Sequence, residues 1–278
     1  MAIKPAIRYF GSKWRLSEWI ISFFPAHRVY VEPYGGSAAI LLRKPISDVE
    51  VYNELDSEVV NFFQVLRDIN LAQELKRLAI LTPFSIGELL EAKPLDCDSP
   101  VERARKLLVR SYMGFSGSEF MYRKNGRNGF RHVGFDAGTD AAKLWASWTD
   151  RVEVLTARLR GVSIERMDAI KLISRYDRHD TLFYIDPPYV HSTRNIAPGI
   201  DEMMYLHGMT DNDHESLSIV LHQVQGFVIL SGYSCELYNR LYSGWELHQI
   251  ESTTNKNAKK VESIWINKKY SGIQGRLL

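Results

Sequence analysis

The most informative stretch of this 278-residue chain is LFYIDPPY, residues 182–189. Four apolar and aromatic residues suited to a buried strand are followed at once by Asp186 and two prolines, which end a strand. The strand therefore stops at an acid, and ligands bind at that edge of an open α/β sheet. Because the prolines fix φ and lack an N–H, the loop is stiff and its carbonyls remain available as acceptors.

This loop suits the recognition of an amino-bearing base. An acid with neighbouring carbonyls can accept both hydrogens of an exocyclic amino group, and Tyr189 supplies a ring that stacks on a planar base. The alternative for the bare tetrapeptide is a structural turn with a capping acid. The tetrapeptide alone leaves both interpretations open.

A second candidate site surrounds Glu32, at the end of an earlier short strand. Gly35 and Gly36 follow it and precede a helical pattern, so the backbone there can approach a ligand closely. Ala38 stands where the dinucleotide fingerprint would have a further glycine. Glu54 ends the next strand, 22 residues after Glu32, and that spacing is typical of an acid that holds ribose hydroxyls. The pair favours an adenosine-bearing cofactor.

The order of the remaining elements predicts an α/β sheet domain interrupted by a second module. RYFGSK (residues 8–13) could be an anion-contacting loop or an N-terminal helix cap, and the cap is the favoured interpretation. The periodicity predicts strands over residues 29–32, 49–52, 162–165, 182–185 and 227–231. It predicts helices over residues 14–24, 38–42 and 144–159, and a mostly helical stretch over 57–110. The glycine-rich stretch 114–138 predicts a hairpin or loop.

Composition bounds the class of protein. Hydrophobic residues make up 45% and charged residues 24%, the mixture of an ordinary globular protein. No apolar run is long enough to span a membrane, and the first residues lack the core of a signal peptide. Cys97 and Cys235 are too few for a disulfide framework or thiolate zinc site, and the histidines show no metal-ligand spacing. We expect a soluble cytoplasmic protein with no metal and no membrane association.

The charge is unevenly distributed although the net charge is only +2. Residues 99–135 hold eight basic and two acidic side chains, an excess of +6 that leaves −4 for the remainder. A basic segment in an acidic frame is typical of a phosphate-binding insert, and solvated helix faces are the alternative. The basic residues are Arg103, Arg105, Lys106, Arg110, Arg123, Lys124, Arg127 and Arg131.

Taken together, these strings resemble the Dam-type, alpha-class DPPY DNA adenine-N6 methyltransferases. The family has an N-terminal aromatic–glycine–lysine motif, a Glu-Pro-Phe glycine loop, an acid after the second strand, and Asp-Pro-Pro-Tyr. The matching strings here are RYFGSK (8–13), VEPYGGSAAILL (31–42), VYNELDSEVVNFFQVLRD (51–68) and LFYIDPPY (182–189). FVILSGYSCELYNRLY (227–242) and KKVESIWINKKY (259–270) also look like the family's tail, so the resemblance covers nearly the whole chain.

The resemblance implies a Rossmann-like S-adenosylmethionine-dependent methyltransferase sheet with an inserted, mainly helical target-recognition domain. The implied parts are residues 1–56 (catalytic, cofactor binding), 57–148 (insert with a basic glycine-rich hairpin) and 149–278 (catalytic, with the DPPY motif). The implied partner is double-stranded DNA, with no obligate protein partner. Departures from the family's pattern are Glu54 for its usual Asp, Tyr9 for its Trp or Phe, and Ser37 and Ala38 in the glycine loop.

The resemblance also implies roles for individual residues. The catalytic residues would be Asp186, Pro187, Pro188 and Tyr189, which grip the target base. The S-adenosylmethionine site would include Tyr9, Lys13, Glu32, Pro33, Gly36, Ser37, Glu54, Asp168 and Asp186, with Glu54 on the ribose hydroxyls and Asp168 near the adenine. The DNA contacts would come from Arg123, Lys124, Arg127 and Arg131.

Three other functions remain as alternatives. An amino-methyltransferase acting on cytosine N4, or on RNA, would use the same acid-and-proline grip. A non-catalytic DNA-binding protein could keep the methyltransferase core as a scaffold, although the intact DPPY argues against it. A nicotinamide oxidoreductase is disfavoured because the dinucleotide fingerprint is missing.

Overall fold

The computed structural model describes residues 3–9, 11–92, 99–114, 129–131, 140–193, 208–253 and 259–267. Contacts between residues divide the chain into two compact units. Unit 1 comprises Met1–Ser17, Gly36–Arg43 and Asp56–Arg166, and unit 2 comprises Glu18–Gly35, Lys44–Leu55 and Met167–Leu278. The chain therefore passes from one unit to the other five times.

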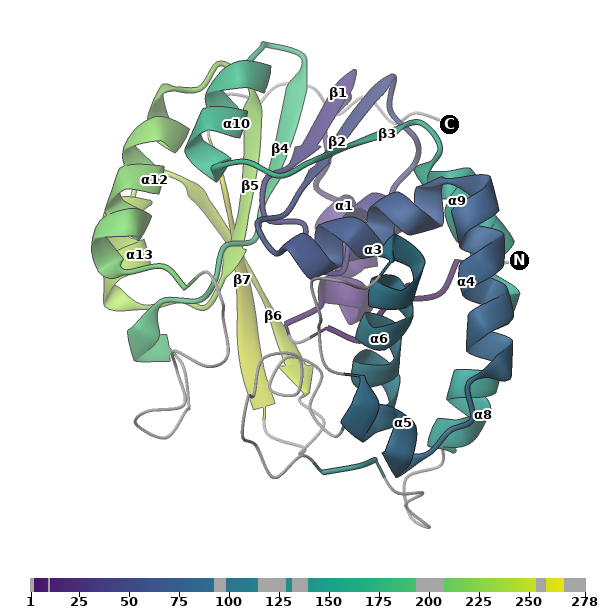
Figure 1. The fold of residues 1–278 in the computed structure, drawn as a ribbon. Helices are drawn as coiled ribbons and strands as arrows, with labels where there is room; N and C mark the ends of the chain where they lie inside the picture. The colour runs from purple at the N-terminus through teal and green to yellow at the C-terminus, as the bar shows by residue number, and fades with distance from the viewer. Residues whose placement is uncertain are drawn as a thin grey trace. The chain divides into compact units, whose positions relative to one another are not determined.

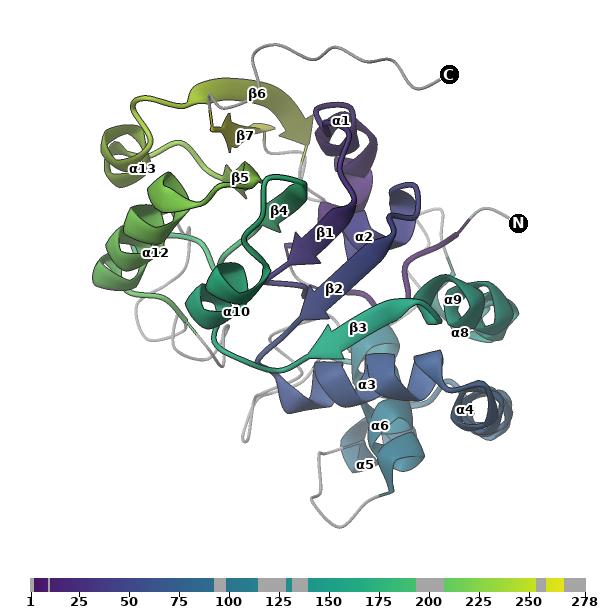
Figure 2. The ribbon, with the colours of Figure 1, turned by 90° about the horizontal axis from the view of Figure 1, so that it is seen from above.

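The strands form one mixed, mostly parallel sheet in the order β3-β2-β1-β4-β5-β7-β6 (Figures 1 and 2). β1 pairs in parallel with β2 and β4, and β4 pairs in parallel with β5, whereas β7 is antiparallel to β5 and β6. The predicted α/β class and Rossmann-like sheet are confirmed. The strands are β1 (Val29–Glu32), β2 (Val49–Asn53), β3 (Val162–Glu165), β4 (Thr181–Ile185), β5 (Phe227–Gly232), β6 (Glu246–Thr253) and β7 (Lys259–Ile266).

The strand order reverses between β1 and β4, both in unit 2. The chain runs from β1 outward to β2 and later returns to β4 on the other side of β1. Such a reversal opens a crevice outside the carboxyl ends of the two strands, where α/β sheets bind ligands. β1 ends at Glu32, and β4 is followed directly by Asp186. The topology therefore places the two main candidate loops at the ligand-binding edge of the sheet.

Helices cover one face of the unit 2 strands. α10 (Ala169–Tyr176), α12 (Asp211–Gln223) and α13 (Glu236–Leu241) lie on the same side of β4 and β5 in both ribbon views (Figures 1 and 2). Leu172, Leu217 and Tyr238 from these helices join Phe183 and Leu230 in the core cluster. β4 and β5 are buried along their whole length, which explains why both are almost continuously apolar.

Unit 1 is mainly helical, as the pattern over residues 57–110 predicted. α3 packs against α6 and α9, and α4 packs against the same two helices (Figure 1). Asp56, Asp68 and Ser99 cap the starts of α3, α4 and α6 with their side chains. The helices are α2 (Ala39–Arg43), α3 (Ser57–Arg67), α4 (Ile69–Leu81), α5 (Ile86–Glu91), α6 (Pro100–Met113), α8 (Ala141–Ala146) and α9 (Val152–Leu159), with 3-10 turns η1 (Lys13–Arg15) and η2 (Thr149–Arg151).

Three expectations from the sequence differ from the structure. The helix expected over residues 144–159 is divided into α8, η2 and α9. The helix expected over residues 14–24 is divided into η1 and α1 (Ser17–Ile21), and the Ser17 hydroxyl donates to the Trp14 carbonyl at the break. A side chain that bonds nearby backbone in this way competes with regular helix. β6 and β7 were not predicted as strands. Among the described residues, no helix is both long and apolar enough to cross a membrane.

Candidate functional site

Asp186 leaves β4 at the carboxyl edge of the sheet and is held by the neighbouring strand. The Ser231 hydroxyl, on β5, donates a hydrogen bond to Asp186 Oδ1 over 3.0 Å. Ser231 and Pro187 are buried, and Asp186 is partly exposed. The carboxylate is therefore fixed from inside the sheet while part of it remains accessible. Ser231 was not among the site residues predicted from sequence.

Tyr189, the last residue of the motif, lies beside a second tyrosine. Its ring centroid is 4.7 Å from that of Tyr233, and the ring planes make an angle of 41°. Tyr233 follows β5 as Tyr189 follows β4, so two adjacent parallel strands each deliver an aromatic ring to the same edge. Sequence reasoning missed Tyr233 because an isolated tyrosine after a strand carries no pattern of its own.

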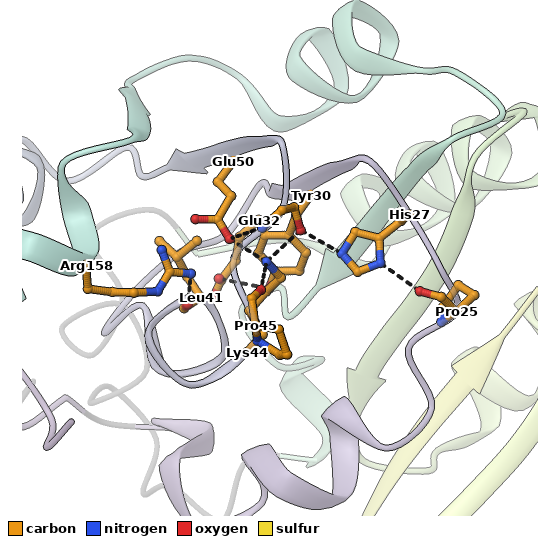
Figure 3. Close-up of polar contacts among 10 residues, drawn as sticks. Pro25, His27, Tyr30, Glu32, Leu41, Lys44, Pro45, Glu50 and Arg158 are labelled. Atoms are coloured by element: carbon orange, nitrogen blue, oxygen red, sulfur yellow. Dashed lines mark hydrogen bonds and ion pairs between the residues drawn. The ribbon is translucent and has the colours of Figure 1, made fainter. Parts of the chain in front are cut away.

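Glu32, at the end of β1, is buried and receives a hydrogen bond from within its own strand. The Tyr30 hydroxyl donates to Glu32 Oε2 over 3.0 Å (Figure 3). Burial, together with the negative charge of Glu32, raises the pKa of Tyr30 well above its ordinary value. The phenol therefore stays protonated over the whole physiological range and remains a hydrogen-bond donor to the carboxylate.

Lys44 lies over the face of the Tyr30 ring. Its ammonium lies 4.5 Å from the centre of the Tyr30 ring and forms an ion pair with Glu50 (Figure 3). It also donates to the Ser47 hydroxyl over 2.8 Å and to the Pro45 carbonyl over 2.6 Å. The Lys44 and Glu50 side chains are 0% and 3% exposed, so their charges are compensated by each other and by these acceptors.

His27 extends the same network towards the amino end of β1. Its Nε2 lies 2.9 Å from the Ser47 hydroxyl and its Nδ1 lies 2.7 Å from the Pro25 carbonyl oxygen (Figure 3). Burial lowers the pKa of His27 below 6.5, and the positive charge of Lys44 acts in the same direction. The imidazole is therefore neutral at pH 7, which suits a structural role under the β1 strand.

Asn53, the last residue of β2, ties two of the candidate loops together. Its Nδ2 donates to the carbonyls of Pro33 and Met167, each over 2.9 Å, and its Oδ1 accepts from the Met167 N–H over 2.9 Å. Its own carbonyl accepts from the Gly35 N–H over 2.8 Å. Asn53 is fully buried. The loop after Glu32 and the loop before Asp168 are therefore fixed relative to each other by one amide.

Position 35, whose N–H binds the Asn53 carbonyl, has room only for a glycine. A Cβ on Gly35 would lie 2.1 Å from the Tyr52 ring, closer than real Cβ contacts come. The loop therefore packs against Tyr52 without a side chain. Tyr34 is largely buried in the same loop, and burial followed by the charge of Asp168 raises its pKa.

Glu54 directly follows Asn53 in the chain, and Asp168 directly follows Met167, one of the residues that Asn53 contacts. Glu54 is partly buried, and its Oε1 accepts from the Leu55 N–H over 2.8 Å. Asp168 is exposed and caps α10, where its Oδ1 accepts from the Lys171 N–H over 3.0 Å. Both acids thus lie near the predicted cofactor loop of unit 2. Helix capping explains Asp168 in part without any ligand.

The predicted cofactor residues of unit 1 come together with one another. The Tyr9 ring packs over Gly36, where an added Cβ would lie 3.2 Å from Tyr9 Cε1. The hydroxyls of Ser12 and Ser37 are 2.8 Å apart. The buried Lys13 follows Ser12 in the chain, and its ammonium donates to the Gly11 carbonyl over 3.3 Å.

The backbone of the glycine loop is left-handed at two positions. Gly36 has φ +47°, and Ala38 has φ +54° although it carries a side chain. Ala38 is fully buried and stands where the resembled family has a glycine, so the loop keeps a glycine-like conformation with an alanine. α2 begins directly afterwards, and the buried Arg158 donates to the Leu41 carbonyl within it (Figure 3).

The basic residues of α6 are committed to internal contacts. Arg103 donates to Glu58, and Arg105 pairs with Glu88 and Glu102. Arg110 is buried, donates to the Ala92 carbonyl over 2.5 Å and lies 3.5 Å from Glu58, and burial lowers its pKa to about 10. Lys106 is buried as well. The +6 excess of residues 99–135 therefore overstates the charge that this segment offers to phosphates.

Of the predicted DNA contacts, Arg131 lies within the described residues, whereas Arg123, Lys124 and Arg127 lie outside them. The Arg131 N–H donates to the Met113 carbonyl over 2.8 Å, beside an antiparallel bridge between Gly114 and Phe130. Burial lowers the pKa of the Arg131 guanidinium. Its Nη1 is buried and has no hydrogen-bond partner among the described residues.

Known proteins resemble this chain along most of its length. The profile of the family described as D12 class N6 adenine-specific DNA methyltransferase matches residues 9–256. The chain is also similar to the Type II methyltransferase M1.LlaDCHI of Lactococcus lactis subsp. cremoris, with 26% identity over 271 residues. That alignment covers 92% of this chain and 90% of the relative. The matched region contains the glycine loop, Glu54 and the DPPY motif.

Proposed function

Because the chain belongs to the D12 class N6 adenine-specific DNA methyltransferase family, we propose that it methylates adenine in double-stranded DNA with S-adenosylmethionine as methyl donor. Family membership makes the chain an adenine-specific DNA methyltransferase. The methyl donor, the duplex form of the DNA and the roles of individual residues are what the proposal adds. Membership also favours adenine over the cytosine and RNA alternatives and over a nicotinamide oxidoreductase.

The position of Asp186 carries the proposal. It follows a buried strand at the point where the strand order reverses, it is partly exposed, and Ser231 fixes one of its oxygens. Asp186 and the Pro187 carbonyl are both acceptors, so together they suit the two hydrogens of an exocyclic amino group. Tyr189 and Tyr233 supply aromatic surface beside them.

The residues of unit 2 fit the proposed methyl donor. S-adenosylmethionine carries ribose hydroxyls and an ammonium group, which carboxylates bind as acceptors. Glu32 is buried with its orientation fixed by Tyr30, Glu54 directly follows Asn53, and Asp168 directly follows Met167, which Asn53 binds. When bound, the donor supplies an electrophilic methyl group. The assignment of Pro33, and of Tyr9, Lys13, Gly36 and Ser37 in unit 1, rests on the sequence resemblance.

The target adenine is inaccessible inside a duplex, so it must leave the stack before reaction. Asp186 and the Pro187 carbonyl would then accept hydrogen bonds from the 6-amino group. These bonds would localise the lone pair of the nitrogen and direct it towards the methyl group of the donor. Tyr189 would stack on the base, an interaction of about 1–3 kcal/mol in proteins that bind single strands. The rate enhancement would come mainly from positioning and electrostatics.

We further propose that the insert, residues 57–148, is the target-recognition domain. Arg123, Lys124, Arg127 and Arg131 would contact DNA, and the internal ion pairs of α6 support a structural role for the remaining arginines. The relative is named a Type II methyltransferase. By similarity, we propose that this chain modifies a fixed DNA sequence as part of a restriction–modification pair.

The test is expression in a host that lacks adenine methylation, followed by long-read sequencing and nucleoside mass spectrometry of its DNA. We expect modified adenine at one sequence motif for the unchanged protein and none for Asp186→Ala. Asp180→Ala is the matched control, because Asp180 lies just before the opposite end of β4 and pairs with Arg178 on the surface. It should methylate normally.

Each contrary outcome has a defined meaning. Methylated cytosine or RNA in place of adenine would contradict the substrate. A soluble protein that neither methylates nor binds S-adenosylmethionine in a calorimeter would support a non-catalytic scaffold. Full methylation by Asp186→Ala would refute the proposed role of Asp186 while leaving the enzyme class intact.

A further inference from the structure

The register between β4 and β5 brings Ser231 opposite the catalytic candidate. The two strands pair in parallel with Ile185 opposite Leu230, so the next residues along the chains are Asp186 and Ser231. The Ser231 hydroxyl makes use of this alignment and donates to Asp186 Oδ1 over 3.0 Å. The contact thus follows from the pairing of central strands and does not depend on a loop.

Ser231 is held more firmly than a loop residue would be. β5 also pairs with β7 on its other side, where Ser231 is opposite Ile264. The side chain is 1% exposed. A hydroxyl in such a place has few alternative partners, and hydrogen bonds to an ionised carboxylate are among the strong ones in proteins. The donor therefore fixes the rotation of the carboxylate about its bond to Cβ.

The same short segment also carries Tyr233. Gly232 lies between the two residues, and a Cβ there would come within 3.0 Å of the Tyr238 ring, so this stretch is packed tightly against α13. The Tyr233 ring then meets the Tyr189 ring at a centroid distance of 4.7 Å and an angle of 41°. Tilted aromatic pairs of this kind attract each other beyond the area that they bury.

We propose that residues 231–233 form a positioning element for the target base. Ser231 orients the Asp186 carboxylate towards the amino group, and Tyr233 holds the Tyr189 ring at the angle at which it stacks on the base. Neither residue needs to touch the transferred methyl group. The inference rests on the proposed function, because Ser231 and Tyr233 act only by positioning Asp186 and Tyr189.

Ser231→Ala tests the first half. We expect kcat to fall at least tenfold, because a misplaced catalytic group loses rate steeply, while the dissociation constants for DNA and S-adenosylmethionine stay within about twofold. Ser231→Thr keeps the hydroxyl and should recover activity to within about threefold of the unchanged enzyme. Ser263→Ala is the matched control, since Ser263 is an equally buried serine on β7 that contacts Gln249 instead.

Tyr233→Ala tests the second half with a different readout. DNA that carries 2-aminopurine at the target adenine becomes fluorescent when that base leaves the stack, so the signal reports the flipped base directly. We expect Tyr233→Ala to lower both this signal and kcat, and Tyr233→Phe, which keeps the ring, to preserve both. Thermal unfolding of every variant is measured alongside.

The outcomes separate this inference from the proposed function. If the unchanged enzyme does not methylate adenine, the proposed function fails. If it does, and Ser231→Ala keeps kcat within twofold, the role of Ser231 is refuted. The role is also refuted if the loss of kcat in Ser231→Ala comes with weaker binding of S-adenosylmethionine and a lower melting temperature. A merely structural serine would behave in that way. If Ser231→Ala does not fold, Ser231→Cys replaces it with the same expectations.

Discussion

Replacing Asn53 by alanine tests how strongly one amide holds the candidate cofactor site. The change removes three hydrogen bonds of 2.9 Å and leaves the Pro33 carbonyl, the Met167 carbonyl and the Met167 N–H without this partner. A buried polar group that loses its partner costs about 1–3 kcal/mol. Water can enter the space left by the side chain and reduce this cost for some of the three groups. We therefore expect Asn53→Ala to lower the free energy of unfolding by about 3–5 kcal/mol.

Asn61→Ala is the matched control. Asn61 is also a buried asparagine, but its Nδ2 makes one hydrogen bond, to the Pro100 carbonyl in unit 1. Its replacement should cost about 1–1.5 kcal/mol. Urea denaturation of the two variants and the unchanged protein gives the comparison, and calorimetry gives the affinity for S-adenosylmethionine. We expect Asn53→Ala to bind it at least tenfold more weakly and Asn61→Ala to bind it normally.

A third variant tests whether the amide group is needed as a hydrogen-bond donor. Asn53→Asp keeps an acceptor for the Met167 N–H but turns a carboxylate oxygen towards the two carbonyls that the amide served. At pH 7 it should be at least as destabilising as alanine. If Asn53→Ala were no less stable than Asn61→Ala, or if its affinity for S-adenosylmethionine were unchanged, Asn53 would not be what holds the two loops together.

Three further changes have expected outcomes. Lys44→Met should cost about 3–5 kcal/mol by urea denaturation because Glu50 stays buried without its cation, and adding Glu50→Leu should restore part of that loss; a double variant as unstable as the sum of both singles would contradict the pairing. The pKa of His27 is lowered in the folded protein, so the unfolded chain takes up a proton first as the pH falls through 6.5, and stability should drop below that pH and drop less in His27→Gln. Ala38→Gly removes about 1–2 kcal/mol of strain from the left-handed backbone, but it also removes a buried methyl group and raises the entropy of the unfolded chain, so the free energy of unfolding should stay nearly unchanged. Ala39→Gly should lower the free energy of unfolding by about 1.5 kcal/mol. Equal losses in both variants would count against the strain.

The strands that build the site could be predicted because their local patterns are strong. Apolar runs bounded by turn residues gave β1 and β3 with the bounds that the structure has, and β4 and β5 within one residue. β6 and β7 were missed because they lie at one side of the sheet and alternate polar with apolar residues only in part, as in Glu246–Thr253. Their strand conformation comes from antiparallel pairing with β5 and with each other, which is not a local property.

The residues that carry the candidate chemistry were predictable, whereas those that hold them were not. Asp186 and Glu32 stand at strand ends next to proline, which is visible in the sequence. Ser231 and Asn53 act through contacts with residues 45 and 114 positions away, respectively. A serine in a strand or an asparagine before a turn has many ordinary explanations, so no local signal identifies either one. The order of the parallel strands was the missing information.

The parallel pairing of β1 with β4 has a consequence for how the protein is made. Val29 pairs opposite Thr181, so the partner of an early strand is synthesised roughly 150 residues later. At about 5–20 residues per second, β1 waits on the order of 8–30 s for β4, with its apolar side chains uncovered in the meantime. The helices Ser57–Arg67, Ile69–Leu81 and Pro100–Met113 find one another within a much shorter length of chain. On the ribosome, the helical unit can therefore assemble first, and the edge that bears Asp186 is among the last parts of the molecule to form.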